Sequence, residues 1–218
     1  SEENSAPNSG DGNNDGVADS LQDNVASFIN PQNDNQYVSV AVNSACQLSD
    51  VAVVAESSES PDVAHEYQIG LVDFTANCGE SGATTEVSLY FYGTDATDKI
   101  VRKYNPNTNS YATLTSASLS TQFIAGEAVA VVSYSVTDGG DQDIDGIVNG
   151  TIVDPVGLAT AIGAPGSTTG SGDGALAPNT GLPPANLATH AIAAVSGVTT
   201  LIILTLPKVR RRLNMLRH

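Results

Sequence analysis

Short runs rich in Val, Thr, Tyr and Phe recur between residues 36 and 137, separated by polar clusters of turn-forming residues. Within residues 86–92 and 132–136 apolar and polar side chains alternate, which is the period of a strand with one buried face. About seven short strands in roughly 100 residues indicate an all-β fold, an antiparallel β-sandwich. The predicted strands are 37–42, 48–55, 67–75, 85–92, 100–104, 111–119 and 128–136.

Two acidic segments, 11–23 and 138–154, lie before and after these strands, and each contains the spacing of a calcium-binding loop. Both loops have oxygen-bearing side chains at alternate positions and a glycine at the sixth position, where such loops turn sharply. Ca²⁺ takes about six to eight oxygen ligands, which short side chains of this spacing can supply. The alternative is a pair of solvated Asp/Gly turns. The predicted Ca²⁺ ligands are Asp11, Asn13, Asp15, the Val17 carbonyl and Asp19, and then Asp141, Asp143, Asp145, the Ile147 carbonyl and Asn149.

The C-terminal quarter of the chain has the layout of a membrane anchor. Residues 157–175 are mainly Gly, Ser, Thr, Ala and Pro, a composition that predicts a disordered, flexible linker. Residues 187–206 contain no acid, Lys or Arg, and as a helix they would span about 30 Å, the hydrocarbon thickness of a bilayer. The basic residues at 207–218 then predict a transmembrane helix whose tail is cytoplasmic.

The hexapeptide at 176–181, Leu-Ala-Pro-Asn-Thr-Gly, lies just before this apolar stretch. Together with the apolar stretch and the basic tail it resembles the LPxTG sorting signal of sortase substrates, with Ala177 where that pattern has Leu. The resemblance implies that Pro178 bends the peptide, that Thr180 forms the thioester with the sortase cysteine, and that Gly181 leaves. Sortase and peptidoglycan would then be partners, and a plain single-pass anchor is the alternative. The implied sorting residues are Ala177, Pro178, Asn179, Thr180 and Gly181.

The charge of the chain argues against nucleic acid as a partner, and the spacing of its cysteines argues against a zinc site. All 24 acidic residues lie at or before Asp173, and a body this acidic repels nucleic-acid phosphates. Cys46 and Cys78 are the two cysteines, and neither belongs to a CxxC pair or a Cys/His cluster. An even pair in an exported domain predicts one disulfide, with two reduced buried thiols as the alternative.

Four stretches of residues 11–155 carry a family resemblance. They are DGNNDGVADSLQDNVAS, YQIGLVDFTANC, RKYNP and VTDGGDQDIDGIVNGTIVDPVG. Together they resemble the bacterial surface domain called choice-of-anchor U, and the first acidic loop resembles a thrombospondin type 3 repeat. The first resemblance implies a β-rich, non-catalytic module near the C-terminus of a large exported protein, ahead of its anchor. Because the chain starts at Ser1 without a signal peptide, we expect it to be processed or cut from a longer protein.

The exported part offers little for catalysis, because His65 is its single histidine and no GxSxG, HExxH or Walker motif occurs. We expect no enzyme but a calcium-stiffened module on the bacterial cell surface, displaying an upstream region from the wall or membrane. The alternatives are an adhesin that binds a ligand on a host or neighbouring cell, and a hydrolase domain. The expected organisation is a disordered segment at 1–10, a β-sandwich domain at 11–156, the linker at 157–175, the sorting motif at 176–181, the transmembrane helix at 187–206 and the tail at 207–218.

Overall fold

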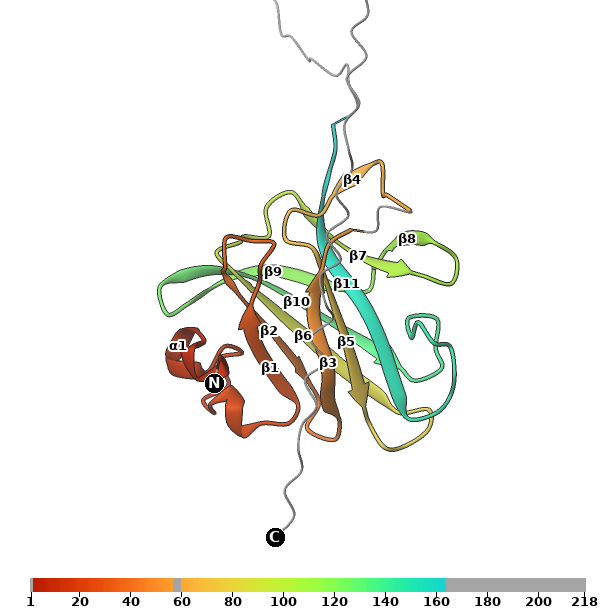
Figure 1. The fold of residues 1–218 in the computed structure, drawn as a ribbon, viewed down its shortest axis with the longest axis horizontal. Coiled ribbons are helices and arrows are strands. Elements are labelled where there is room, and N and C mark those ends of the chain that lie inside the picture. Colours follow the sequence, from red (N-terminus) through yellow and green to blue (C-terminus); the bar gives the residue numbers. More distant parts are fainter. Residues whose placement is uncertain (1, 57–59, 164–218) are drawn as a thin grey trace, which may run out of the picture. The chain divides into compact units, whose positions relative to one another are not determined.

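A computed structural model describes residues 2–56 and 60–163 of the chain. Within these ranges nearly all regular structure is antiparallel β-strand, arranged in two sheets (Figure 1). Sheet A has the spatial order β1-β2-β6-β10-β9. Its strands are β1 (Val25–Ile29), β2 (Tyr37–Val42), β6 (Thr84–Tyr92), β9 (Ser118–Ile124) and β10 (Glu127–Thr137).

Sheet B has the spatial order β3-β5-β11-β7-β8, and the short strand β4 pairs with the end of β11. The last strand, β11, is therefore a central strand that lies between β5 and β7. The strands of sheet B are β3 (Gln47–Val54), β4 (His65–Glu66), β5 (Leu71–Asn77), β7 (Lys99–Asn105), β8 (Ser110–Thr113) and β11 (Thr151–Ala161).

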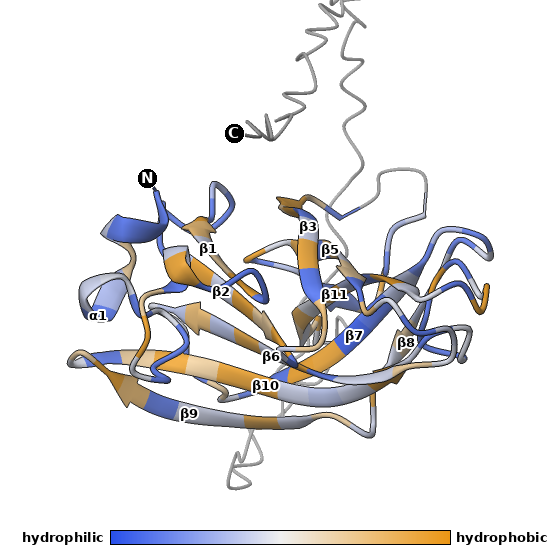
Figure 2. Cartoon of the chain, turned by 90° about the horizontal axis from the view of Figure 1, so that it is seen from below, coloured by the Kyte–Doolittle hydropathy of each residue, from blue (hydrophilic) through white to orange (hydrophobic). Residues whose placement is uncertain are grey.

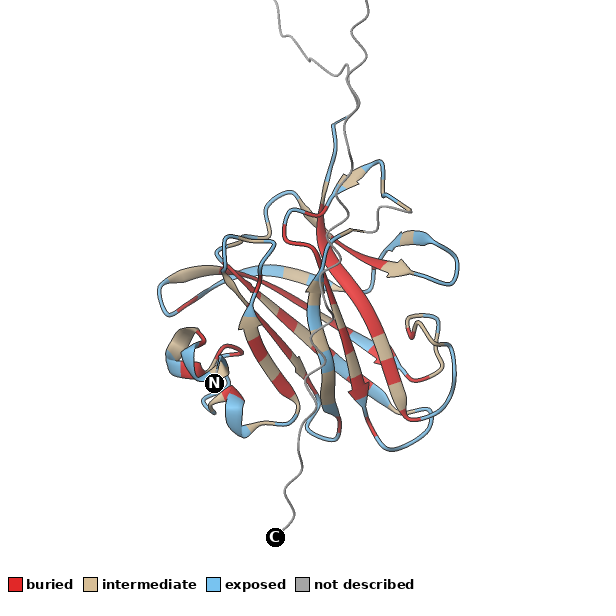
Figure 3. Ribbon diagram, in the orientation of Figure 1, coloured by how far each residue is buried: buried red, intermediate tan, exposed pale blue. Residues whose placement is uncertain are grey.

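The hydrophobic core is made by the facing sides of the two sheets, whose hydropathy pattern is drawn in Figure 2. From sheet A, Leu89 and Val132 are fully buried, and from sheet B, Val72, Phe74 and Ile152 are at most 1% exposed. Every second residue of β6 is buried, as the alternation predicted. Burial is densest along β11, most of which is buried in Figure 3. The predicted all-β, sandwich-like fold is confirmed for the described residues.

The disulfide prediction is also confirmed. Cys46 and Cys78 are joined at a Cα–Cα distance of 4.0 Å, next to the paired residues Gln47 and Asn77 of β3 and β5. Both cysteines are buried and belong to the core between the sheets. The disulfide therefore extends the β3–β5 ladder by a covalent rung.

The N-terminal segment differs from its prediction. Residues 1–10 were expected to be disordered, yet η1 (Glu3–Ser5) and α1 (Pro7–Gly10) are two short helical turns, followed by η2 (Asp19–Leu21). The Glu2 carboxylate accepts the Ile29 amide of β1 at 2.7 Å, and Ala6 is buried. These contacts with sheet A fix a segment whose polar composition alone gives no reason to fold.

The strand count differs too, because the described ranges contain eleven strands instead of about seven. The predicted strand at 111–119 is split between β8 and β9, and β1, β4 and β11 were not predicted. Pro155 and Gly157 disfavour a strand locally, yet two neighbouring strands enclose β11. The predicted linker therefore begins too early, since residues 157–161 belong to β11.

The remaining C-terminal predictions lie outside the described residues. They are the rest of the linker at 164–175, the sorting motif at 176–181, the transmembrane helix at 187–206 and the basic tail at 207–218. In the part of the chain that the structure describes, no helix is long and apolar enough to cross a membrane.

Candidate functional site

The first acidic loop, residues 11–19, packs on the outer face of sheet A. The Tyr92 hydroxyl donates a hydrogen bond to the Gly12 carbonyl at 2.8 Å, which links the loop to β6. A Cβ on Gly12 would lie 2.2 Å from the Ser39 hydroxyl and 2.6 Å from that of Ser27. Only glycine therefore lets the loop approach the sheet this closely.

Side chains of this loop hold its turn. Asp11 accepts the backbone amides of Asp15 and Gly16, both at 2.9 Å. Gly16 has a φ of 91°, a conformation that glycine adopts without strain. The Gln22 amide nitrogen lies 3.2 Å from both the Asp15 carboxylate and the Val17 carbonyl. These two predicted ligand oxygens therefore converge on one point.

Asp19, the ninth residue of the loop, is fully buried. Its Oδ2 accepts hydrogen bonds from the Gly12 amide and the Ser27 hydroxyl, whereas its Oδ1 is buried without a hydrogen-bond partner. Burial raises the pKa of Asp19, and the charges of Asp11 and Asp15 raise it further against the hydrogen bonds. A carboxylate in these surroundings would be stabilised by a cation.

The first loop's remaining predicted ligand is Asn13. Its side-chain amide donates to the Asp15 carboxylate at 2.8 Å, and it is 9% exposed. Burial alone would raise the pKa of Asp15, but the hydrogen bonds from Asn13, the Val17 amide and Gln22 lower it. Asn13 and Val17 are thus hydrogen-bonded to Asp15, whereas the buried Asp19 bonds to Gly12 and Ser27.

The second acidic loop, residues 141–149, lies between β10 and β11 and uses its acids differently. Asp143 is buried, and its two oxygens accept the Gly139 and Val153 amides at 2.8 and 3.0 Å. The oxygens of Asp145 accept the Ile147 amide and the Asn149 side chain. Both carboxylates are thus bonded within the protein, and a cation would have to replace some of these bonds.

Asp141 is exposed and borders a cleft of about 390 Å³ between the second loop and β7–β8. Lys103, Leu114, Gln142 and Ile144 also line this cleft. Asn149 uses its side-chain oxygen to accept the Thr151 amide at 2.7 Å. Across residues 2–56 and 60–163, no group of three or more His, Cys, Asp and Glu side chains is arranged to hold a metal ion. The predicted sites also use Asn side chains and backbone carbonyls, and calcium binding stays a prediction for both loops.

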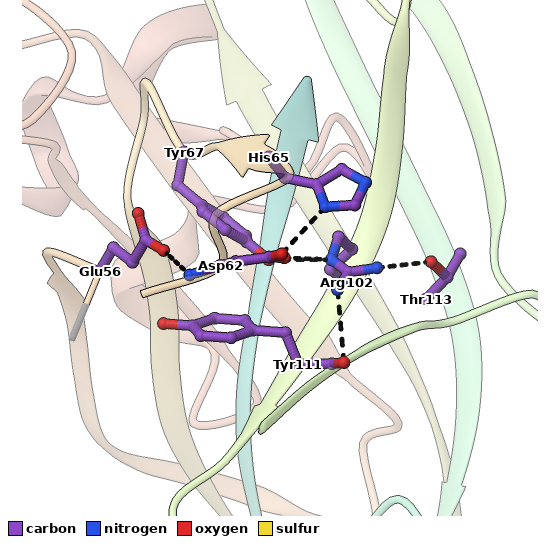
Figure 4. Close-up of polar contacts among 7 residues, drawn as sticks. All are labelled: Glu56, Asp62, His65, Tyr67, Arg102, Tyr111 and Thr113. Carbon is purple, nitrogen blue, oxygen red and sulfur yellow. Dashed lines mark hydrogen bonds and ion pairs between the residues drawn. The ribbon is translucent and has the colours of Figure 1, made fainter. Parts of the chain in front are cut away.

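A cluster that sequence reasoning missed lies on the outer face of sheet B (Figure 4). The Asp62 Oδ2 lies 2.6 Å from Arg102 Nε and accepts the Tyr67 hydroxyl at 2.9 Å, while Asp62 Oδ1 lies 3.0 Å from His65 Nδ1. Arg102 also donates to the Thr113 hydroxyl at 2.7 Å. This Arg102 cluster ties the segment before β5, and strand β8, to β7. Asp62 and Arg102 are 40 positions apart in the chain, so no local pattern indicates that they meet.

Comparison of the chain with family models, curated proteins and solved structures gives no match. The choice-of-anchor U resemblance therefore stays an expectation that rests on the stretches quoted for it.

Proposed function

We propose that this chain is a non-catalytic, calcium-stiffened module that displays an upstream region from a bacterial cell wall or membrane. The observation that carries the proposal is the order of its parts. A disulfide-linked sandwich ends with β11 at Ala161, and the anchor-like pattern of 176–218 follows after the 14 residues 162–175. A disulfide suits an exported protein, since oxidising compartments preserve it.

The position of β11 supports a role in carrying load. Its hydrogen bonds run to β5 on one side and to β7 on the other. Because the strand is central, pulling on its C-terminal end would load two antiparallel ladders at once, whereas an edge strand has one. A chain attached to a wall or membrane at this end would be held by the most buried strand of sheet B.

Anchoring by a sortase predicts that Thr180→Ala moves the protein from the wall fraction to the membrane fraction, because the thioester-forming side chain is lost. Asn179→Ala is the matched control, since the pattern leaves this position free. The measurement is immunoblotting of wall and membrane fractions from cells that express the wild type or one of the two variants. Wall attachment that is unchanged in Thr180→Ala would reject the sortase route and leave the plain membrane anchor.

Calcium would be held in the first loop by the Asp11, Asn13, Asp15 and Asp19 side chains and the Val17 carbonyl. The support is the unpartnered, buried Oδ1 of Asp19, together with the convergence of the Asp15 and Val17 oxygens. A bound cation would offset the repulsion among the acids, and its binding energy would add to folding stability. Ion binding would fix the N-terminal segment, which leads to the upstream region, onto sheet A.

We expect millimolar calcium to raise the free energy of unfolding by about 1 kcal/mol over EDTA at the weak affinity of extracellular sites. For a domain of this size the melting temperature would rise by about 2–4 °C, and magnesium would raise it less. Asp19→Asn keeps an oxygen for Gly12 and Ser27 but places an amide at the unpartnered position. This variant is expected to match or exceed the wild type in EDTA and to gain nothing from calcium.

Asp34→Asn is the control for the loss of one negative charge, because Asp34 lies in the β1–β2 turn outside both loops. It is expected to keep the full calcium effect. Melting curves of the three proteins with EDTA and with calcium make the comparison. Equal melting temperatures of the wild type in both conditions would reject the calcium site and mean that the first loop is an ordinary acidic turn.

A further inference from the structure

A lysine and an aspartate meet inside the sandwich, where charged side chains are rare. Lys103 lies on β7 and Asp154 on the neighbouring strand β11. The Lys103 Nζ is 2.9 Å from Asp154 Oδ2, and the two residues are 8% and 0% exposed. Ile152 and Val156, which share a face of β11 with Asp154, are fully buried core residues.

Two more groups orient this pair. Tyr134, on β10 of the opposite sheet, donates its hydroxyl to Asp154 Oδ2 at 2.8 Å. Lys103 Nζ also donates a hydrogen bond to the Gln142 carbonyl. In contrast, Asp154 Oδ1 is buried without a hydrogen-bond partner. One oxygen of the carboxyl group is therefore held by two donors and the other by none.

A buried ion pair at this position contributes little to stability. Removing two charges from water is costly, and the unpartnered oxygen adds to that cost. Burial raises the pKa of Asp154, although the Lys103 charge and the hydrogen bonds from Lys103 and Tyr134 oppose it. The geometry thus holds an amine and a carboxyl group, which are a nucleophile and an electrophile, in contact at 2.9 Å between Nζ and Oδ2.

We propose that Lys103 and Asp154 join in an intramolecular isopeptide bond. The Lys103 Nζ attacks Cγ of Asp154, and a bond forms between them. The amine and the carboxyl group hold three protons between them, of which one stays on Nζ. The other two leave with Oδ1 as water when the Cγ–Oδ1 bond breaks. The step needs no oxidant or other reagent. Tyr134 stabilises the negative charge that develops on Oδ2, and the cleft beside Lys103 and Gln142 gives the water a way out.

The existing contacts suit the product better than the reactants. The amide carbonyl is Oδ2, which keeps its hydrogen bond from Tyr134. The amide N–H is on Nζ, which keeps the Gln142 carbonyl as its acceptor. The atom that departs is Oδ1, the one without a partner. Bond formation therefore removes two buried charges and an unsatisfied oxygen, and leaves each polar group of the amide satisfied.

The cross-link would fasten β11 covalently to β7. Since β11 leads to the proposed anchor, a force applied there could not separate these two strands. This consequence rests on the proposed function, whereas the bond itself does not, because its chemistry depends only on the interior of the sandwich.

The mass of the purified full chain, reduced and denatured, tests the bond. We expect a value lower than the sequence mass by one water molecule. Trypsin locates the loss, because no Lys or Arg lies between Lys103 and Lys208 and an amide-linked lysine is not cleaved. The expected fragment is 103–208 less one water, whereas an unlinked chain gives 104–208.

Two variants complete the test. Lys103→Arg keeps the charge but cannot form this amide, so it is expected to have its full sequence mass and a wild-type circular dichroism spectrum. Tyr134→Phe keeps the ring and removes the donor, and we expect the bond to form about 100-fold more slowly in freshly made protein. A folded wild type with its full mass and with cleavage after Lys103 would overturn the proposal and leave an ion pair, whether or not Lys103→Arg folds.

Discussion

Replacing both Cys46 and Cys78 with Ala is expected to lower the free energy of unfolding by about 3–4 kcal/mol. The disulfide joins residues separated by 32 positions, and closing a loop of that length restricts the unfolded chain. The two sulfur atoms are also buried in the core, so their removal adds a packing loss. Urea unfolding of wild type and variant measures the difference.

Reduction of the wild-type protein is the control that separates the cross-link from the packing. It breaks the bond and keeps both side chains, so it should reproduce most of the loss. If reduction leaves the urea midpoint unchanged, the disulfide contributes nothing to stability. The disulfide spans residues 46–78 and the proposed isopeptide bond spans residues 103–154. Because these spans do not overlap, the two cross-links restrain different parts of the unfolded chain, and their effects on stability should add.

The alternation of side chains was the most reliable guide to the fold. Strand β2 has the predicted bounds, and β6 differs from its prediction by one residue, because both strands bury one face against the core. No such alternation marks β11, because consecutive residues of this strand are buried on both of its faces. Pro155 and Gly157 resemble linker residues when seen in sequence alone. Their strand conformation depends on partners that lie far away in the chain.

The candidate sites show the same division between local and distant information. Spacing alone predicted Asp19 as a ligand of the first loop. Its burial against Ser27 and its unpartnered oxygen depend on how the loop docks on sheet A. The Lys103–Asp154 pair and the Arg102 cluster could not be predicted at all. Each joins residues about 40 or more positions apart, whose proximity follows from strand order.

Replacing Arg102 with Met is expected to lower the free energy of unfolding by about 3 kcal/mol at pH 7. The variant leaves the Asp62 carboxylate largely buried without its cation, and Thr113 loses its donor. This loss is near the lower end of the range for breaking a buried ion pair, because Tyr67 and His65 still contact Asp62. Arg102→Lys is the matched control, since it keeps the charge but not the forked donors, and it should lose less.

The pH dependence separates this charge effect from a simple packing loss. Burial alone would raise the pKa of Asp62, but hydrogen bonds from His65 and Tyr67 and the charge of Arg102 lower it below its ordinary value of 3.8. A lowered carboxyl pKa contributes stability that is complete above the unfolded value and is lost as pH falls through the folded one. The gap between wild type and Arg102→Met in urea midpoint should therefore shrink from pH 7 to about pH 3. The double variant Asp62→Asn with Arg102→Met should regain part of the loss, because no buried charge remains. Equal gaps at both pH values would mean that Arg102 acts by packing alone.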